Sequence, residues 1–235
     1  MQAAIIAAGL GERLVAAGIT QPKPLVEVAG QALIDYALAG VSAAGITDVA
    51  CIVNEMSAGI EDHCRQRWPG LRFAFVRRTT PSSMESLFTL SPLLGAARFL
   101  LLTTDSVCSP DVVRSFVRAT ARHDDADGVL ALSGFVDDEK PLWAHVEPDG
   151  RLTALGPEAR DSGLVTAGFY VFDAGIFREI DPARQGRFTA LRQFLGHLLT
   201  RGYRLYGEPV GKTVDVDRPE DLGVAEAFVR GGYRE

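Results

Sequence analysis

Short apolar runs alternate along this chain with longer segments of helical period, and this alternation restricts the fold more than any other feature. The apolar runs are 3–7, 48–53, 72–76, 99–103 and 128–132, and the segments of helical period are 32–44, 57–68 and 111–123. Strands joined by crossover helices build a mainly parallel sheet. The expected fold class is therefore α/β.

The pattern changes after residue 142. Residues 143–147 and 151–155 flank Pro148-Asp149-Gly150, whose turn chemistry predicts a hairpin and hence an antiparallel addition to the sheet. The later expected elements are a strand at 165–172, a helix at 189–201, a strand at 203–208 and a final helix from Pro219. No repeat or change of composition marks a linker, so we expect a single domain.

Acidic side chains outnumber basic ones, with 30 Asp and Glu against 24 Lys and Arg in 235 residues. The net charge of −6 argues against nucleic-acid or anionic-membrane partners, but it leaves room for a local basic pocket that binds a small phosphorylated ligand. The longest apolar stretches are far shorter than the roughly 20 residues of a membrane span. The three cysteines form no metal or disulfide pattern. Reduced thiols in a cytoplasmic protein are expected.

A glycine loop follows the first expected strand. Its residues are Ala7, Ala8, Gly9, Leu10, Gly11, Glu12 and Arg13. Glycines let backbone N–H groups approach a phosphate closely, and an arginine adds a forked cation. The loop does not match the dinucleotide-binding fingerprint, because Leu14 stands where that motif has its third glycine. It does not match a Walker A loop either, because no Gly-Lys-Ser/Thr follows. A tight turn with a solvated arginine is the alternative.

A proline-braced lysine follows in Pro22-Lys23-Pro24-Leu25. Two prolines stiffen the segment and project Lys23, so Lys23 and Arg13 are placed to face the same phosphates. An exposed lysine on a stiff loop is the alternative, although it explains Lys23 alone and not the combination.

Acidic residues follow two later expected strands. Asp105 comes after the run 99–103, at a strand end where a carboxylate can hold Mg²⁺. Asp215 and Asp217 share one face of a strand that leads into the final helix. A turn cap is the alternative for Asp105, and a helix N-cap with Glu220 as its partner is the alternative for Asp217. Asp215 has no such structural role and is the better metal candidate.

These motifs together resemble the nucleotidyltransferase superfamily that makes nucleotide-activated sugars and related phosphates. Its signature is Ala-Ala-Gly-x-Gly-x-Arg-Leu, seven residues, and then Pro-Lys-Pro-Leu, which this chain matches from Ala7 to Leu25. The molybdopterin-guanine transferases of the superfamily place the lysine closer to the arginine, so the spacing favours the other members. The resemblance implies a Rossmann-like three-layer α/β/α fold with a mixed, mainly parallel sheet and a small antiparallel C-terminal elaboration.

The resemblance also implies roles for individual residues. Arg13, Lys23 and Asp105 are the expected catalytic residues, and Mg²⁺ is the expected cofactor, held by Asp105, Asp215 and Asp217. The nucleotide is expected at the glycine loop, Lys23, Ser83 and Ser86, although a capped helix start also explains the two serines. Residues 1–132 would then be the nucleotide-binding part of the domain 1–235, and 133–235 the acceptor-binding part and C-terminal elaboration.

The acceptor is less defined. Sugar-1-phosphate members carry Glu-Lys-Pro before an Asn/Thr-x-Gly strand, where this chain has Leu155-Gly156-Pro157 and no such glutamate. Thr166 and Gly168 are the expected acceptor-binding residues, with a plain edge strand as the alternative. The segment 80–87 is similar to the Ser-Leu segment of choline- and inositol-phosphate cytidylyltransferases. A sugar phosphate and a choline or polyol phosphate therefore both remain as acceptors.

The expected reaction is attack of an acceptor phosphate oxygen on the α-phosphorus of a nucleoside triphosphate, with loss of pyrophosphate. A nucleotide-sugar glycosyltransferase would need Asp-x-Asp at a middle strand, and Thr103-Thr104-Asp105-Ser106 offers a single acid. A non-catalytic nucleotide-binding regulator is disfavoured because Arg13, Lys23, Asp105 and Asp215 are all present. The expected partners are the two small substrates, and the sequence leaves homo-oligomerisation open.

Overall fold

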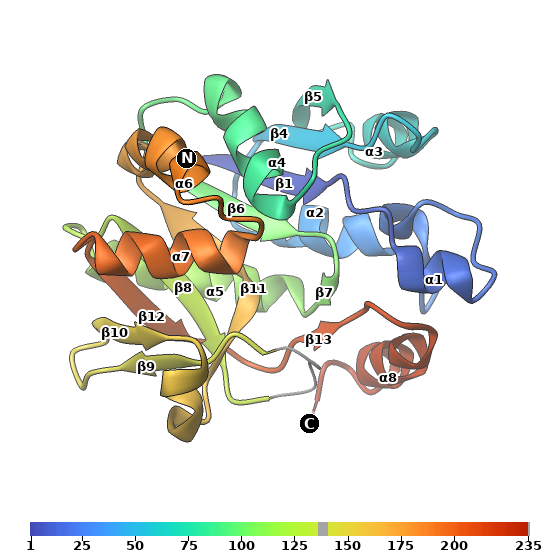
Figure 1. Cartoon of the computed structure of the whole chain (residues 1–235). Helices are drawn as coiled ribbons and strands as arrows, with labels where there is room; N and C mark the ends of the chain where they lie inside the picture. Colours follow the sequence, from blue (N-terminus) through green and yellow to red (C-terminus); the bar gives the residue numbers. More distant parts are fainter. Residues whose placement is uncertain (136–140, 235) are drawn as a thin grey trace.

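A twisted seven-stranded sheet forms the centre of the computed structural model, which describes residues 1–135 and 141–234 (Figure 1). The strand order is β12-β8-β11-β6-β1-β4-β5, and β11 alone among these strands runs antiparallel to its neighbours. The strands are β1 (Gln2–Ala7), β4 (Asp48–Val53), β5 (Arg72–Arg77), β6 (Phe99–Thr103), β8 (Gly128–Ser133), β11 (Val165–Phe172) and β12 (Leu205–Pro209). The mixed, mainly parallel α/β fold is confirmed.

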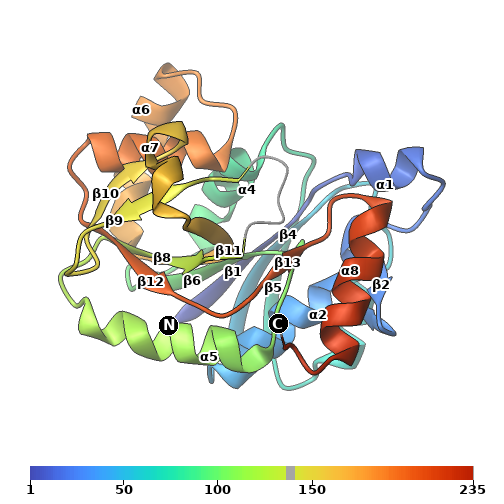
Figure 2. The same cartoon turned by 90° about the horizontal axis from the view of Figure 1, so that it is seen from below.

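Helices cover both faces of this sheet (Figure 2). One face carries α4 (Ser83–Leu90), α6 (Ile180–Gln185) and α7 (Leu191–Thr200), and the other carries α2 (Leu33–Ala43), α3 (Ile60–Arg67) and α5 (Pro110–Ala119). Side chains of β1 alternate between the two cores: Ala4 and Ile6 pack under α4, and Ala3 and Ile5 pack under α2. Burial on both faces explains why the strands are continuous apolar runs in the sequence.

A third apolar cluster joins the C-terminal segment to the N-terminal loops. It contains Leu14, Val26, Val107, Val214 and Phe228. These residues come from α1 (Glu12–Ala16), from the segment after the 3-10 turn η1 (Lys23–Leu25), from β7 (Ser106–Val107), from β13 (Val214–Asp215) and from α8 (Pro219–Arg230). The short antiparallel pairs β13–β7 and β2 (Glu27–Val28)–β3 (Gln31–Ala32) belong to this region. The cluster fixes the segment that carries Asp215 beside the sheet.

The expected hairpin is present as β9 (Ala144–Val146) and β10 (Leu152–Leu155). It forms a two-stranded sheet of its own and does not extend the central sheet as the sequence suggested, because only isolated bridges, Trp143 to Val165 and Arg151 to Tyr206, connect the two among the described residues. Its apolar side chains pack instead with those of α7. The hairpin therefore supports the helix that begins at Leu191.

Other differences are local. The helix expected from residue 57 begins at Ile60, after Gly59 at φ +85°. Helices α1 and α6 were not expected, and α4 begins where a capped helix start was the alternative for Ser83 and Ser86. The 3-10 turns are η2 (Ser91–Leu93), η3 (Thr120–Arg122), η4 (Pro157–Ser162) and η5 (Ala174–Glu179). The three cysteines are buried and free, as expected. No helix within the described residues has the length and apolarity to cross a membrane.

Candidate functional site

The candidate site lies where parallel strands β1 and β6 end side by side. Ile6 pairs with Thr103, so the glycine loop and Asp105 leave the sheet at the same edge. Asn54, at the end of β4, is 1% exposed and donates from Nδ2 to the carbonyl of Ala8 at 3.3 Å. Three neighbouring strand ends therefore shape one edge of the sheet, which is where open α/β sheets bind ligands.

The glycine loop closes against Lys23. Gly11 has φ +62° and precedes α1, which carries Arg13. A Cβ at Gly11 would lie 2.8 Å from the Cβ of Lys23, which is closer than such atoms approach. Gly11 is therefore needed both for its backbone conformation and for this contact. The two halves of the sequence signature pack directly on each other.

Lys23 lies between two of the predicted acids. Its Nζ is 2.5 Å from Asp217 Oδ1 and 3.6 Å from Asp105 Oδ2, and the residue is 9% exposed. Burial by itself would lower the pKa of Lys23, but Asp105, Asp217 and Asp215 outweigh burial and raise this pKa above its ordinary value. The exposed-lysine alternative is wrong, and Lys23 is a charged, buried group.

Asp217 pairs with cations and is not the cap of α8. Its Oδ2 lies 3.9 Å from Arg13, and although burial would raise its pKa, Lys23, Arg13 and Arg218 lower it. The backbone N–H groups of Asp217 and Arg218 donate to the Asp221 carboxylate at 2.8 and 2.7 Å. The N-cap interpretation of Asp217, with Glu220 as partner, is wrong because Asp221 holds the start of the helix.

Asp215 and Asp105 are joined through the pairing of β13 with β7. The hydroxyl of Ser106 donates to Asp215 Oδ1 at 2.5 Å, and the N–H of Val216 donates to the carbonyl of Asp105 at 2.9 Å. Asp105 does not act as the cap before Pro110, because the hydroxyl of Ser109 accepts the bond at the start of α5. Two carboxylates from distant parts of the sequence are thus placed at one point.

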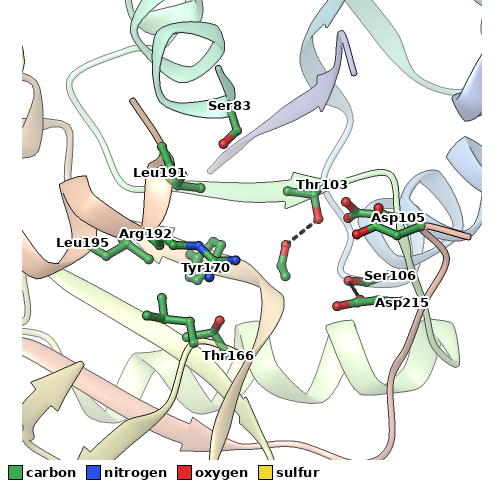
Figure 3. Close-up of a pocket in the computed structure, with 14 residues that line it drawn as sticks. Ser83, Thr103, Asp105, Ser106, Thr166, Tyr170, Leu191, Arg192, Leu195 and Asp215 are labelled. Carbon is green, nitrogen blue, oxygen red and sulfur yellow. Dashed lines mark hydrogen bonds between the residues drawn. The ribbon is translucent and has the colours of Figure 1, made fainter. Parts of the chain in front are cut away.

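Two cavities meet at Asp105. The loop cavity, about 290 Å³, is lined by the glycine loop, Lys23 and the segment that enters α4. The strand cavity, about 280 Å³, lies between β6, β11, α7 and the C-terminal segment (Figure 3). Ser83, Thr103 and Asp105 line both cavities. A ligand in one cavity would therefore lie next to a ligand in the other.

The predicted nucleotide residues divide around the loop cavity. Those that line it are Ala8, Gly9, Leu10, Glu12, Lys23, Ser83 and Ser86, whereas Ala7, Gly11 and Arg13 lie next to it in the chain. Ser82 accepts the N-cap bond of α4 from Glu85, so neither predicted serine is the cap. Ser86 is buried and shares a hydrogen bond of 2.6 Å with Thr80.

Both predicted acceptor residues line the strand cavity. Gly168 has φ +81° and sits in a β-bulge, where the register of β11 against β8 shifts between Thr166 and Tyr170. A Cβ at Gly168 would lie 2.3 Å from the Ser106 hydroxyl that holds Asp215. The plain edge strand is excluded, because β11 lies inside the sheet between β8 and β6. The bulge therefore lets the Ser106 hydroxyl approach the backbone of β11 closely.

The acidic residues fit a magnesium ion. Asp105, Asp215 and Asp217 all line the strand cavity, and Mg²⁺ commonly uses one or two protein carboxylates and completes its shell with water and substrate phosphates. The described residues contain no group of three His, Cys, Asp or Glu arranged as a complete protein site. Lys23 lies 2.5 Å from Asp217 but 3.6 Å from Asp105, so Asp105 and Asp215 are the pair better placed to hold the ion.

Sequence reasoning missed part of the strand cavity. Arg192 lines it from the first turn of α7, and its signal, one arginine among the apolar residues of an expected helix, was too weak to identify. Tyr170, an aromatic in a strand that the sequence favours as core over ligand stacking, also lines the cavity and is 5% exposed, and burial raises its pKa to about 12. Ser106 orients Asp215, which no sequence spacing indicates.

Known proteins are similar to this chain in sequence. A bifunctional IPC transferase and DIPP synthase from Rubrobacter xylanophilus is 27% identical over 97% of this chain and 52% of its own. A glucose-1-phosphate thymidylyltransferase from Streptomyces antibioticus is 28% identical over 86% of this chain and 58% of its own. This chain thus spans little more than half the length of these curated relatives. Neither relative is a molybdopterin transferase.

A solved structure supports the fold. The inositol-1-phosphate CTP transferase from T. maritima superimposes with a TM-score of 0.82 at 20% identity, over 97% of this chain and 95% of that one. The model of the family described as "MobA-like NTP transferase domain" matches residues 3–168, which hold the glycine loop, Lys23, Asp105 and the bulge at Gly168. This chain belongs to the MobA-like NTP transferase domain family.

Proposed function

We propose that this protein transfers a nucleoside monophosphate from a nucleoside triphosphate to a phosphorylated small metabolite and releases pyrophosphate. The observation that carries the proposal is the meeting of the loop cavity and the strand cavity at Asp105, with Lys23 buried beside it. Transfer between two substrates needs adjacent sites that share a centre of charge stabilisation. The names of the relatives, a thymidylyltransferase and an IPC transferase, support the same reaction class.

The nucleotide is proposed to occupy the loop cavity. Backbone N–H groups of the glycine loop would face its phosphates, and Arg13 and Lys23 would supply positive charge from the two sides of the loop. In the structure both cations contact Asp217. Binding of the triphosphate would move part of these contacts from the carboxylate to phosphate oxygens, so Asp217 keeps both cations positioned before the substrate arrives.

The acceptor is proposed to occupy the strand cavity. Its phosphate would lie near Asp105, with the hydroxyl of Thr166 and the space above Gly168 beside the rest of the molecule. A phosphate monoester is already an anion near neutral pH, so its oxygen attacks the α-phosphorus without a general base. Mg²⁺ held by Asp105 and Asp215 would supply charge stabilisation at the transferring phosphate.

Sugar phosphates and choline or polyol phosphates are the proposed acceptor classes. We further propose that residues 1–235 act as one domain, with the nucleotide bound by 1–132 and the acceptor bound by 133–235. Buried, reduced cysteines agree with a cytoplasmic enzyme.

Pyrophosphate release tests the proposal. Wild-type protein with Mg²⁺ is assayed over CTP, UTP, GTP, ATP and dTTP against glucose 1-phosphate, inositol 1-phosphate, glycerol 3-phosphate and phosphocholine. Asp105→Ala is the blank, and Asp62→Ala, which removes an exposed carboxylate on α3, is the matched control. We expect release for one combination in wild type and Asp62→Ala but not in the blank. Nucleotide binding without release would favour a regulator, and equal release in the blank would contradict the role of Asp105.

A further inference from the structure

The strand cavity has two unlike walls. Asp105 and Asp215 lie on one side of it (Figure 3), and Asp217 also lines it. Leu191, Arg192 and Leu195 of α7 lie on the opposite side (Figure 3), and Tyr170 and Thr166 also line the cavity. Among the described residues that line this cavity, Arg192 is the one that carries a positive charge. An acceptor whose phosphate lies at the acidic wall would therefore present its other end to Arg192.

We infer that Arg192 is the residue that selects the acceptor, and that it favours acceptors with hydroxyl or anionic oxygens, as in sugar and polyol phosphates, over acceptors with a quaternary ammonium group. This inference rests on the proposed function. A guanidinium presents five N–H donors in a fixed plane and has no acceptor. Hydroxyl and phosphate oxygens can accept these bonds, whereas a trimethylammonium group accepts none and is repelled by the charge.

The other lining residues agree with an oxygen-rich acceptor. The cavity is lined by the hydroxyls of Ser83, Thr103, Ser106, Thr166 and Tyr170. Recognition of a quaternary ammonium normally uses the open faces of several aromatic rings. Tyr170 is the one aromatic among the described lining residues, and at 5% exposed its ring is mostly covered. The cavity thus offers hydrogen bonds and no aromatic cage.

Buried neighbours fix the backbone at Arg192, but the position of Arg192 in the helix does not stabilise its charge. Its neighbours Leu191, Phe194 and Leu195 are buried in the core, which fixes the first turn of α7, while Arg192 itself is exposed. A positive side chain in the first turn faces the positive end of the helix dipole, which is unfavourable for stability. The helix dipole therefore does not account for a positive charge at this position.

Steady-state kinetics on Arg192→Gln provide the test, with the nucleotide found in the substrate panel. We expect the KM for the sugar or polyol phosphate to rise about tenfold, as for loss of one charge-assisted hydrogen bond, with the KM for the nucleotide unchanged. Arg192→Lys should restore part of the loss. Arg118→Gln, which removes an exposed arginine from α5, is the matched control and should behave as wild type. Melting temperatures of all variants verify folding.

The comparison of acceptors completes the test. Wild type should prefer glucose 1-phosphate or inositol 1-phosphate to phosphocholine, and Arg192→Gln should reduce that preference. An unchanged KM in Arg192→Gln, or a wild-type preference for phosphocholine, would overturn the inference. If wild type releases no pyrophosphate with any pair, the proposed function fails, and calorimetry with the same three phosphates then decides: binding lost in Arg192→Gln supports the inference, and equal binding, or none, overturns it.

Discussion

Lys23 is buried between Asp105 and Asp217. If its ammonium group were removed, a water molecule in its place would supply no positive charge to the phosphates. We predict that Lys23→Met, which keeps the hydrocarbon stem, lowers kcat/KM by roughly a hundredfold, as for loss of one fixed donor to developing charge. Lys212→Met is the control, because Lys212 lies over the rings of Phe135 and Phe228 and lines neither cavity. Pyrophosphate-release kinetics compare the two. Full activity of Lys23→Met would mean that Lys23 does not contact the phosphates.

Gly168 couples the bulge of β11 to the acids. A methyl group there meets the Ser106 hydroxyl, and the φ of +81° is strained for alanine. We predict that Gly168→Ala destabilises the protein by about 1–3 kcal/mol and displaces Asp215 enough to abolish most activity. Gly196→Ala is the matched control, because nothing lies within 4 Å of a Cβ there and alanine favours the helix α7. Chemical denaturation and turnover are the measurements, and equal behaviour of the two variants would contradict this account.

At the scale of elements, the start of α8 fixes the segment that carries Asp215 and Asp217. The Asp221 carboxylate accepts the N–H groups of Asp217 and Arg218. We predict that Asp221→Ala lowers the free energy of unfolding by about 1 kcal/mol, as for loss of a helix cap, and also reduces turnover. Asp221→Asn retains an acceptor oxygen, so its free energy of unfolding and its turnover should lie between those of the wild type and of Asp221→Ala. A stability loss without any loss of turnover would show that the cap does not position the site.

Glu179 is the buried last residue of η5, and its carboxylate contacts side chains of α7 and of the segment between α7 and β12. Its carboxylate accepts from His197 at 2.7 Å and from Tyr203 at 3.2 Å, with Arg201 at 3.4 Å. Burial would raise the pKa of Glu179, but His197, Tyr203 and Arg201 lower it below its ordinary value of 4.5. A lowered pKa means that the ionised carboxylate stabilises the folded state above that ordinary value and loses this effect as pH falls through the folded pKa.

We predict that Glu179→Gln costs about 1–3 kcal/mol at neutral pH, because it weakens a buried network. The difference from wild type should shrink as pH falls below about 4.5 toward the lower pKa that Glu179 has in the folded protein. Urea denaturation of both proteins at several pH values measures this. A difference that stays constant down to pH 3 would contradict the ion-pair account.

At the scale of the whole molecule, local periodicity predicted the fold because the strands are buried on both faces. β1, β4 and β6 are continuous apolar runs, and the seven-stranded sheet forms around them. The hairpin at 143–155 was predicted from its turn, but its separate sheet was not, because local sequence does not say what a strand packs against. A helix start at α4 was only an alternative for Ser83 and Ser86, because serines at such a position also suit a ligand-binding loop.

Part of the site could be predicted because residues suited to binding phosphate or metal occur at recognisable spacings near the ends of expected strands. Lys23, Asp105 and Asp215 were found by type and spacing, and the structure brings them to one edge of the sheet. The burial of Lys23 and the position of Arg192 across the strand cavity from the acids depend on contacts between distant segments, which no spacing encodes. For Asp217, which was expected at the metal, the alternative of a helix cap with Glu220 was wrong, because the packed helix uses the Asp221 carboxylate instead.

Phosphorus NMR of the reaction mixture tests the central claim most directly. The wild-type protein is incubated with Mg²⁺ and the nucleotide and acceptor that give a signal in the substrate panel, and Asp105→Ala is the blank. The account predicts that pyrophosphate and a new diphosphate diester appear in equal amounts. The acceptor phosphate attacks the α-phosphorus to form the diester, and the β- and γ-phosphates of the nucleotide leave together as pyrophosphate. Orthophosphate with a nucleoside diphosphate, or pyrophosphate with free monophosphate and no diester, would contradict it.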